Sequence, residues 1–240
     1  MAKKRKKRGS LYLIPTTLGD TEPLEVLPLS VKRTIEGITY FIVENEKSAR
    51  RFIKKIHPRK SQASLVLMAL NKFTDASQIP SFLDPCLEGH DVGVLSEAGS
   101  PAVADPGAEV VKIAHEKGIA VVPMVGPSSL LLALMGSGLN GQQFAFHGYL
   151  PIDKADRKKK IKELEKESRE KDQTQLFIET PYRNNSLIHH LLATLSKKTY
   201  LCIAADLTLP TEFISTLTID EWQEKIPDLH KRPTLFLIKA

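Results

Sequence analysis

The chain has little cysteine, no long hydrophobic run and no secretory leader pattern. Cys86 and Cys202 are its only cysteines and form no CxxC pair, so we expect two reduced, buried thiols rather than a disulfide framework. No stretch approaches the roughly 18 apolar residues that a membrane-spanning helix needs, and the basic N-terminus lacks the apolar segment of a signal peptide. These absences favour a cytoplasmic protein that has no membrane partner.

Several familiar catalytic signatures are also missing. The sequence contains no GxxxxGK[ST] and no GxSxG, which argues against nucleoside triphosphate hydrolysis and serine-hydrolase chemistry. Its seven histidines show no HExxH spacing, and His189-His190 lies in an apolar helical segment that favours a structural role. We therefore expect no metal site.

The positive charge is concentrated in one segment. Every residue of Lys3–Arg8 is basic, and these six residues equal the whole formal net charge of +6. We predict that residues 1–9 form a disordered tail, which either solubilises the chain or binds RNA phosphates by releasing counterions. Arg157 and Lys158, in a charged helical segment over 153–172, are predicted RNA contacts. The alternative is a solvated helix with Glu–Lys pairs.

Apolar strands alternate with helical segments through the first half of the chain, which indicates a mostly parallel sheet. The second half alternates less strictly, which indicates a mixed sheet. The predicted fold class is therefore α/β, with two α/β domains over residues 10–124 and 125–240 and a cofactor cleft between them. The predicted strands are 11–14, 38–43, 65–70, 91–95, 119–123, 144–147, 175–179, 200–204, 212–216 and 233–238.

Two loops of small residues follow predicted strands, and in α/β proteins such loops present backbone groups to polar ligands. In the first, Gly99 allows a close approach of a ligand to the backbone and Ser100 offers a hydroxyl, while Glu97 and Asp105 offer acceptors for amino or ribose hydroxyl groups. Asp105 alternatively caps the helix that begins after it. In the second loop, Ser128 and Ser129 either cap a helix or receive a carboxylate at its N-terminus.

Ser96–Gly107 reads SEAGSPAVADPG, which resembles the SDAGTPLISDPG signature of the tetrapyrrole methylase superfamily, the class III S-adenosylmethionine-dependent methyltransferases. Other blocks of that family follow in the same order. Together they look most like the ribosomal RNA small subunit methyltransferase I branch. These blocks are LYLIPTTLGD (Leu11–Asp20), ENEKSARRFI (Glu44–Ile53), GPSSLLLALMGSGL (Gly126–Leu139), FHGYLP (Phe146–Pro151) and ETPYR (Glu179–Arg183).

The resemblance implies S-adenosyl-L-methionine as cofactor, a homodimer, and transfer of a methyl group to a cytidine ribose 2′-hydroxyl of small-subunit ribosomal RNA. Together with the loop chemistry it assigns cofactor binding to residues in three segments. These are Glu97, Gly99, Ser100, Val103, Ala104, Asp105, Ser128, Ser129, Glu179, Thr180 and Pro181.

The chain departs from the family pattern at several positions. Asn45 stands where the family's EDTR block has an acid, and Glu97 is one methylene longer than the aspartate of SDAG. Ala205 and Leu209 stand where a RELTK segment has an arginine and a lysine, which removes two phosphate partners. These departures keep a different acceptor open.

A ribose hydroxyl must lose its proton during methyl transfer, so a base has to lie nearby. Glu44, at a predicted strand end, is the predicted base and Asp20 the second candidate; both alternatively orient the substrate or stabilise the fold. Two other functions remain open: methylation of a small molecule such as a tetrapyrrole, and a catalytically silent, cofactor-binding, RNA-associated protein.

Overall fold

The computed structural model describes residues 7–240, which divide into two compact units, residues 7–128 and Ser129–Ala240. The predicted tail falls mainly on residues 1–6, outside the described part. Gly9 is already buried and its amide donates to the Cys86 carbonyl at 2.9 Å, so the predicted tail does not extend to Gly9. The sequence placed the domain boundary four residues earlier, after residue 124.

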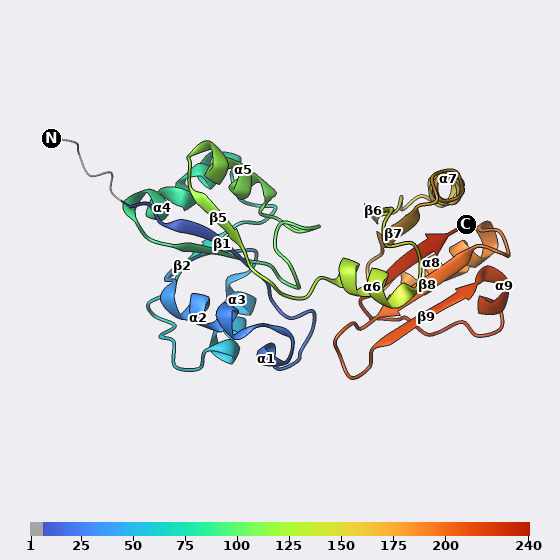
Figure 1. Cartoon of the computed structure of the whole chain (residues 1–240), viewed down its shortest axis with the longest axis horizontal. Coiled ribbons are helices and arrows are strands. Elements are labelled where there is room, and N and C mark those ends of the chain that lie inside the picture. The colour runs from blue at the N-terminus through green and yellow to red at the C-terminus, as the bar shows by residue number, and fades with distance from the viewer. Residues whose placement is uncertain (1–6) are drawn as a thin grey trace. The chain divides into compact units, whose positions relative to one another are not determined.

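The first unit is built on a five-stranded sheet in the order β3-β2-β4-β1-β5 (Figure 1). Every pairing in it is parallel, because helical crossovers connect its strands. Its strands are β1 (Ser10–Ile14), β2 (Tyr40–Val43), β3 (Val66–Ala69), β4 (Val92–Leu95) and β5 (Ala120–Pro123).

Helices cover both faces of this sheet (Figure 1). One face packs a buried cluster that includes Ile14, Ile35 and Ile53 under the first three helices, and the other packs a cluster that includes Leu83 and Val110 under the rest. This double cover explains why the strand β4 is buried along its whole length. The helices are α1 (Pro23–Val26), α2 (Leu29–Gly37), α3 (Glu46–Ile56), the 3-10 helix η1 (Ala76–Leu83), α4 (Asp84–Glu88) and α5 (Ala108–Glu116).

The second unit contains a mixed five-stranded sheet in the order β6-β7-β10-β8-β9. Only β6 and β7 pair in parallel, and the other neighbours are antiparallel. Its elements are α6 (Ser129–Ser137), β6 (Phe144–Tyr149), α7 (Lys154–Lys171), β7 (Thr174–Ile178), α8 (Asn184–Thr194), β8 (Tyr200–Ala205), β9 (Phe213–Thr218), α9 (Ile219–Trp222) and β10 (Thr234–Lys239).

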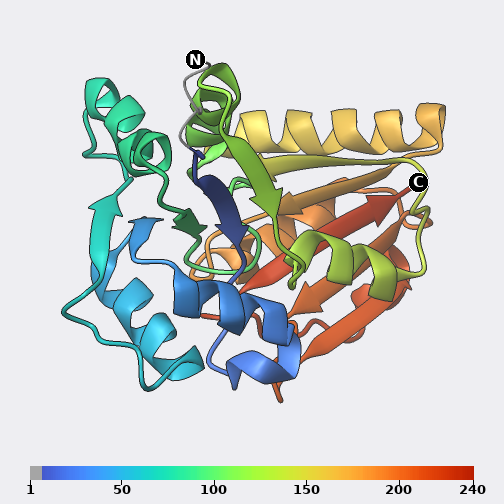
Figure 2. The same ribbon diagram turned by 60° about the vertical axis from the view of Figure 1, so that its left-hand side comes forward.

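The core of the second unit lies between one face of this sheet and the helices α7, α8 and α9. Ile161, Leu191 and Trp222 pack there against Phe177 and Phe236, and the Trp222 indole N–H donates to the Leu201 carbonyl at 2.8 Å. Figure 2 shows α7 as a long straight helix beside the strands. The predicted fold class, with a parallel first sheet and a mixed second sheet, is confirmed.

A side-chain cap determines where the helix α3 begins. The helix α3 begins at Glu46, because the Asn45 side chain accepts from the amides of Lys47 and Ser48 at 2.9 and 3.2 Å. Ser48, which could also cap a helix by residue type, lies inside the first turn of α3. Cys86 and Cys202 are free and buried, as predicted, and burial raises the pKa of each thiol to about 11.

Candidate functional site

The carboxyl ends of β1, β2, β4 and β5 carry most of the predicted site residues. Parallel strands place these ends along one edge of the sheet, where the connecting loops meet. Residues Asp20, Glu44, Glu97, Gly99, Ser100, Val103, Ala104, Asp105 and Ser128 all belong to this first unit. The remaining predicted residues, Ser129, Arg157, Lys158, Glu179, Thr180 and Pro181, belong to the second unit.

Hydrogen bonds hold the loops after β1, β4 and β5 together. The Thr16 amide and the Ser96 hydroxyl donate to the Gly99 carbonyl at 2.9 and 2.6 Å. The Ser100 hydroxyl donates to the Pro127 carbonyl at 3.3 Å. The two loops that the sequence selected as cofactor-binding are therefore in direct contact.

Glycine is required where these loops approach each other. Gly99 has φ +75°, and a Cβ there would lie 2.9 Å from Leu18 Cδ2. A Cβ on Gly126 would lie 2.2 Å from Pro15 Cγ. Both distances are too short for a side chain, so close backbone contact fixes these two glycines.

The loop after β4 also contains strained residues that are not glycine. Ala102 and Ala104 have φ values of 65° and 61°, a region that costs an L-residue roughly 1–2 kcal/mol. Val103, between them, is 49% exposed despite its apolar side chain. Strain of this kind is concentrated at ligand sites, where it aims backbone groups outward. Two residues that the sequence assigned to the cofactor thus lie in the most strained part of the loop.

Three carboxylates interact at the same edge. Burial, together with the charges of Glu44 and Glu97, raises the pKa of Asp105 to about 6. Burial also raises the pKa of Glu44, with a second contribution from Glu97. Glu97 is exposed and accepts a 2.6 Å hydrogen bond from the Ser48 hydroxyl. Because the three acids repel one another, a positively charged ligand would stabilise their ionised forms.

Asp20 has a different setting from Glu44. Its side chain is 99% exposed and pairs with Lys55 Nζ at 2.8 Å. The hydrogen bond from Lys55 lowers the pKa of Asp20, which makes this carboxylate a weaker proton acceptor. Of the two predicted bases, Glu44 has the environment that suits general-base chemistry better.

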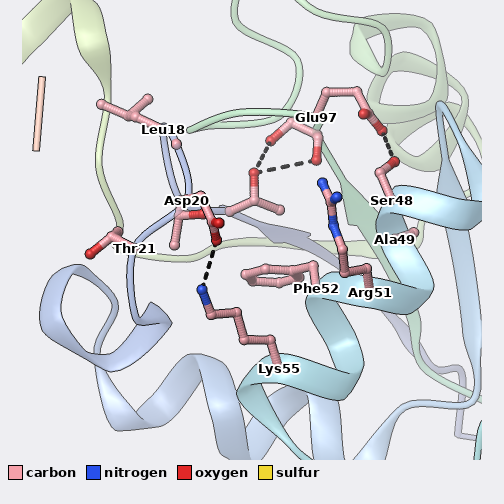
Figure 3. A pocket seen from close by; sticks show the side chains of 13 residues that line it. Leu18, Asp20, Thr21, Ser48, Ala49, Arg51, Phe52, Lys55 and Glu97 are labelled. Carbon is pink, nitrogen blue, oxygen red and sulfur yellow. Dashed lines mark hydrogen bonds and ion pairs between the residues drawn. The ribbon is translucent and has the colours of Figure 1, made fainter. Parts of the chain in front are cut away.

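A cavity of about 240 Å³ opens between the loop after β1, the helix α3 and the start of the loop after β4 (Figure 3). Sequence reasoning selected Asp20 and Glu97 in its wall but missed the helix. The signal was available, because residues three or four positions apart share a helix face. The residues that α3 contributes are Ser48, Ala49, Arg51, Phe52 and Lys55.

Glu179 is held inside the second unit. Its carboxylate Oε1 accepts from the Thr180 amide at 2.7 Å and from Arg183 Nη2 at 2.6 Å. Its other oxygen, Oε2, is buried without a hydrogen-bond partner among the described residues. The Pro181 carbonyl accepts from the Lys231 amide at 3.0 Å. This turn is rigid, and one carboxylate oxygen still lacks a donor.

Arg157 is buried, so it cannot contact RNA unless the residues around it move. It is 4% exposed, and its guanidinium donates to the carbonyls of Pro151 and Ile152 at 2.8 and 2.7 Å. A third nitrogen lies 3.0 Å from His190 Nδ1. Arg157 therefore stabilises the segment before α7, and we leave it out of the proposed RNA contacts. Lys158, by contrast, is exposed.

Two structural features are absent from residues 7–240. No helix there is both long and apolar enough to cross a membrane. No group of three or more His, Cys, Asp and Glu side chains there is placed to hold a metal ion.

Three relatives share one name. Ribosomal RNA small subunit methyltransferase I of Escherichia coli O157:H7 is 28% identical over 238 residues, covering 97% of this chain and 78% of that protein. The protein of that name from Buchnera aphidicola is 28% identical over 87% of this chain and 69% of its own length. The one from Streptococcus pyogenes serotype M6 is 30% identical over 80% and 62%, respectively. No protein-family model matches.

Solved structures share the fold at low sequence identity. The methyltransferase CobJ superposes with a TM-score of 0.63 at 16% identity, covering 97% of this chain and 94% of that one. The cobalt precorrin-4 methyltransferase CbiF superposes with a TM-score of 0.60 at 13% identity, over 96% and 94%. The chain is therefore a homologue of the ribosomal RNA small subunit methyltransferase I proteins and has the fold of the tetrapyrrole methylases, which confirms the predicted resemblance.

Proposed function

We propose that the chain is an S-adenosyl-L-methionine-dependent methyltransferase that methylates a ribose 2′-hydroxyl of ribosomal RNA or a related RNA. The observation that carries this proposal is the hydrogen-bonded pair of loops after β4 and β5, in a chain whose homologues are named as ribosomal RNA methyltransferases. A cytoplasmic homodimer is part of the proposal, since it follows from the same family resemblance.

The residues of the first unit fit this cofactor. S-adenosylmethionine carries a positive sulfonium. The ionised forms of Glu44, Glu97 and Asp105 repel one another, and a positive charge beside them would offset this repulsion. The glycine and alanine residues beside them let a ligand approach backbone amides and carbonyls. In the proposal the cofactor contacts are those assigned by the sequence: Glu97, Gly99, Ser100, Val103, Ala104, Asp105, Ser128, Ser129, Glu179, Thr180 and Pro181.

When bound, S-adenosylmethionine supplies a methyl group that is already activated by the sulfonium. The protein therefore has to align acceptor and donor, a contribution worth up to about 7–11 kcal/mol. The hydrogen bonds that fix the loop at Gly99 limit its motion and serve this alignment. With the cofactor bound, the acceptor oxygen would take the methyl carbon, the sulfur would keep the electron pair of the broken bond, and the hydroxyl proton would pass to a base of the protein.

Glu44 is the proposed base. It lies directly after β2 and is half-buried, and burial together with the charge of Glu97 raises its pKa. A raised pKa increases the affinity of the carboxylate for the proton that it accepts. Asp20 instead holds Lys55 in an ion pair at 2.8 Å, and we assign it an orienting role.

A second candidate function is methylation of a small molecule such as a tetrapyrrole. Ala205 and Leu209, where the related RNA-modifying family has basic residues, favour it. Arg232 is a cation near this segment, but its Nε already donates to Asp206 Oδ2 at 2.7 Å. The sequence homology over 97% of the chain argues for RNA instead.

One assay separates the candidates. The full chain is incubated with S-adenosylmethionine carrying a radiolabelled methyl group and one of three acceptors: small ribosomal subunits that lack methylation, a tetrapyrrole precursor, or none. We expect label in ribosomal RNA at a ribose position. Label in the tetrapyrrole supports the second candidate, and cofactor binding without transfer supports a catalytically silent protein.

A further inference from the structure

The helix α3 is the most uniformly basic short helix of the first unit. Its eleven residues, EKSARRFIKKI, include five lysines and arginines against one glutamate. Sequence reasoning placed RNA contacts on α7, where Lys160, Lys166 and Lys171 are paired with glutamates. The positive charge of α3 is neutralised by fewer acidic residues on the same helix than that of α7. The helix α3 also forms one wall of the cavity described above.

The cations of α3 are not equivalent. Arg50 donates to the Gln62 carbonyl at 2.8 Å, and Lys55 pairs with Asp20 and Glu22 at 2.8 and 3.6 Å. Arg51 has neither a hydrogen bond nor an ion pair with any described residue. It is exposed and lines the cavity, and Figure 3 shows its guanidinium group turned into that space.

The rest of the wall offers the apolar and aromatic surface that a nucleotide base or sugar can contact. Phe52 is half-buried beside Arg51 and presents an aromatic ring, and Leu18 adds apolar surface. The acids of the wall are already engaged, Glu97 by Ser48 and Asp20 by Lys55. One unengaged guanidinium therefore faces the cavity, and a phosphate is the group that its planar fork binds most strongly.

The size of the cavity limits its occupant. Its volume of about 240 Å³ lies below the range of about 300–1,000 Å³ that is typical for pockets of drug-sized ligands. A whole S-adenosylmethionine is drug-sized, whereas the phosphate of an extended RNA and part of the attached sugar or base need only part of such a space. The loop after β5, which the proposed cofactor site includes, does not line this cavity.

We propose that this cavity takes one nucleotide of the RNA acceptor, with Arg51 bound to its phosphate and Phe52 in contact with its base or sugar. This inference rests on the proposed RNA methyltransferase function. Arg51 is a positioning residue, because the phosphate that it holds is not the reacting group. It sets which nucleotide enters the site by fixing the RNA backbone.

The test compares Arg51→Gln with Arg33→Gln. Arg33 is an exposed arginine on α2 of the same unit that does not line the cavity, so both variants lose one charge. Binding of an unmodified small-subunit ribosomal RNA transcript is measured by filter binding between low and moderate salt. We expect Arg51→Gln to weaken binding about tenfold at low salt and to lower the salt slope by about one. Arg33→Gln should stay within about twofold, and Arg51→Lys should lie between.

Two further readouts distinguish a phosphate contact from a change in the fold or in the cofactor site. In the methyl-transfer assay Arg51→Gln should raise the KM for RNA more than it lowers kcat, and its affinity for S-adenosylmethionine should be unchanged. Equal behaviour of the two glutamine variants, or a selective loss of cofactor affinity in Arg51→Gln, overturns the inference while the proposed function stands. If the wild-type chain transfers no methyl group to RNA, the proposed function and the phosphate assignment both fail.

Discussion

The hydroxyl of Ser48 donates a 2.6 Å hydrogen bond to the carboxylate Oε1 of Glu97. This contact joins the first turn of α3 to the loop after β4, and it connects the proposed RNA cavity to the acid cluster. A hydrogen bond to a charged group contributes about 1.5–3 kcal/mol in favourable cases. Since Glu97 is exposed, we expect the lower end of that range or less.

Ser48→Ala should therefore lower the free energy of unfolding by about 1 kcal/mol, measured by urea denaturation. Ser48→Thr keeps the hydroxyl and should retain most of the stability. Ser64→Ala is the control, because its hydroxyl bonds only the nearby Ser61 carbonyl at 2.9 Å. An equal effect of Ser48→Ala and Ser64→Ala would show that the bond to Glu97 contributes nothing particular.

The pKa of Asp105 predicts a pH-dependent gain in stability on removing its charge. The folded-state pKa is about 6, above the ordinary aspartate value of 3.8. The folded protein thus keeps the Asp105 proton where the unfolded chain has lost it, and stability falls as the pH rises from about 4 to about 6. Above that window the cost of the buried charge is fully present.

Asp105→Asn should accordingly raise the melting temperature at pH 7.5 and leave it nearly unchanged at pH 4. Thermal unfolding followed by circular dichroism at both values checks this. Asp84→Asn serves as a control, since Asp84 is exposed and its contact with Lys117 Nζ is long, at 3.7 Å. This variant should show little change in melting temperature at either pH. Destabilisation by Asp105→Asn at pH 7.5 would contradict the burial of an unfavourable charge.

Gly99→Ala should weaken both the fold and cofactor binding. The new Cβ would meet Leu18 Cδ2 at 2.9 Å and the Pro127 carbonyl oxygen at 3.2 Å, at a φ of +75°. We expect a loss of about 1–2 kcal/mol in unfolding free energy. Gly37→Ala is the matched control, because Gly37 is the last residue of α2 and no atom lies within 4 Å of the added carbon. This variant should be neutral or slightly stabilising.

Glu44→Gln tests the base assignment. Removing a general base typically costs about 10²–10⁴ in the rate of the chemical step, so single-turnover methyl transfer should slow by that amount while the cofactor still binds. Glu46→Gln changes a neighbouring exposed acid, whose nearest cation Arg50 is 4.0 Å away, and should leave the rate unchanged. Unchanged single-turnover rates in Glu44→Gln would remove Glu44 from the reaction.

The sequence predicted the ten strands because most of them are short apolar runs ended by polar or turn residues. It predicted the loops after β4 and β5 because small residues follow apolar runs there. It missed α1, where only Pro23 of four residues is buried, so no apolar period marks the helix. Short segments without a buried face carry little signal in a single sequence.

The tertiary surroundings of single charged side chains could not be predicted. Arg157 lies in a run of basic residues that reads as exposed, yet the carbonyls of Pro151 and Ile152 and the ring of His190 surround it. Arg51 has the same local pattern of charge but lines a cavity. The difference depends on distant segments that fold against each side chain, which local periodicity does not contain.

Cofactor binding by the loops after β4 and β5 is the central claim about this protein. Isothermal titration of S-adenosylmethionine into the wild-type chain and into Gly99→Ala at pH 7.5 tests it directly. We predict one saturable site per wild-type chain and at least tenfold weaker binding in Gly99→Ala, with Gly37→Ala unchanged. No saturable heat with the wild-type chain, or equal affinity in all three proteins, would contradict the account.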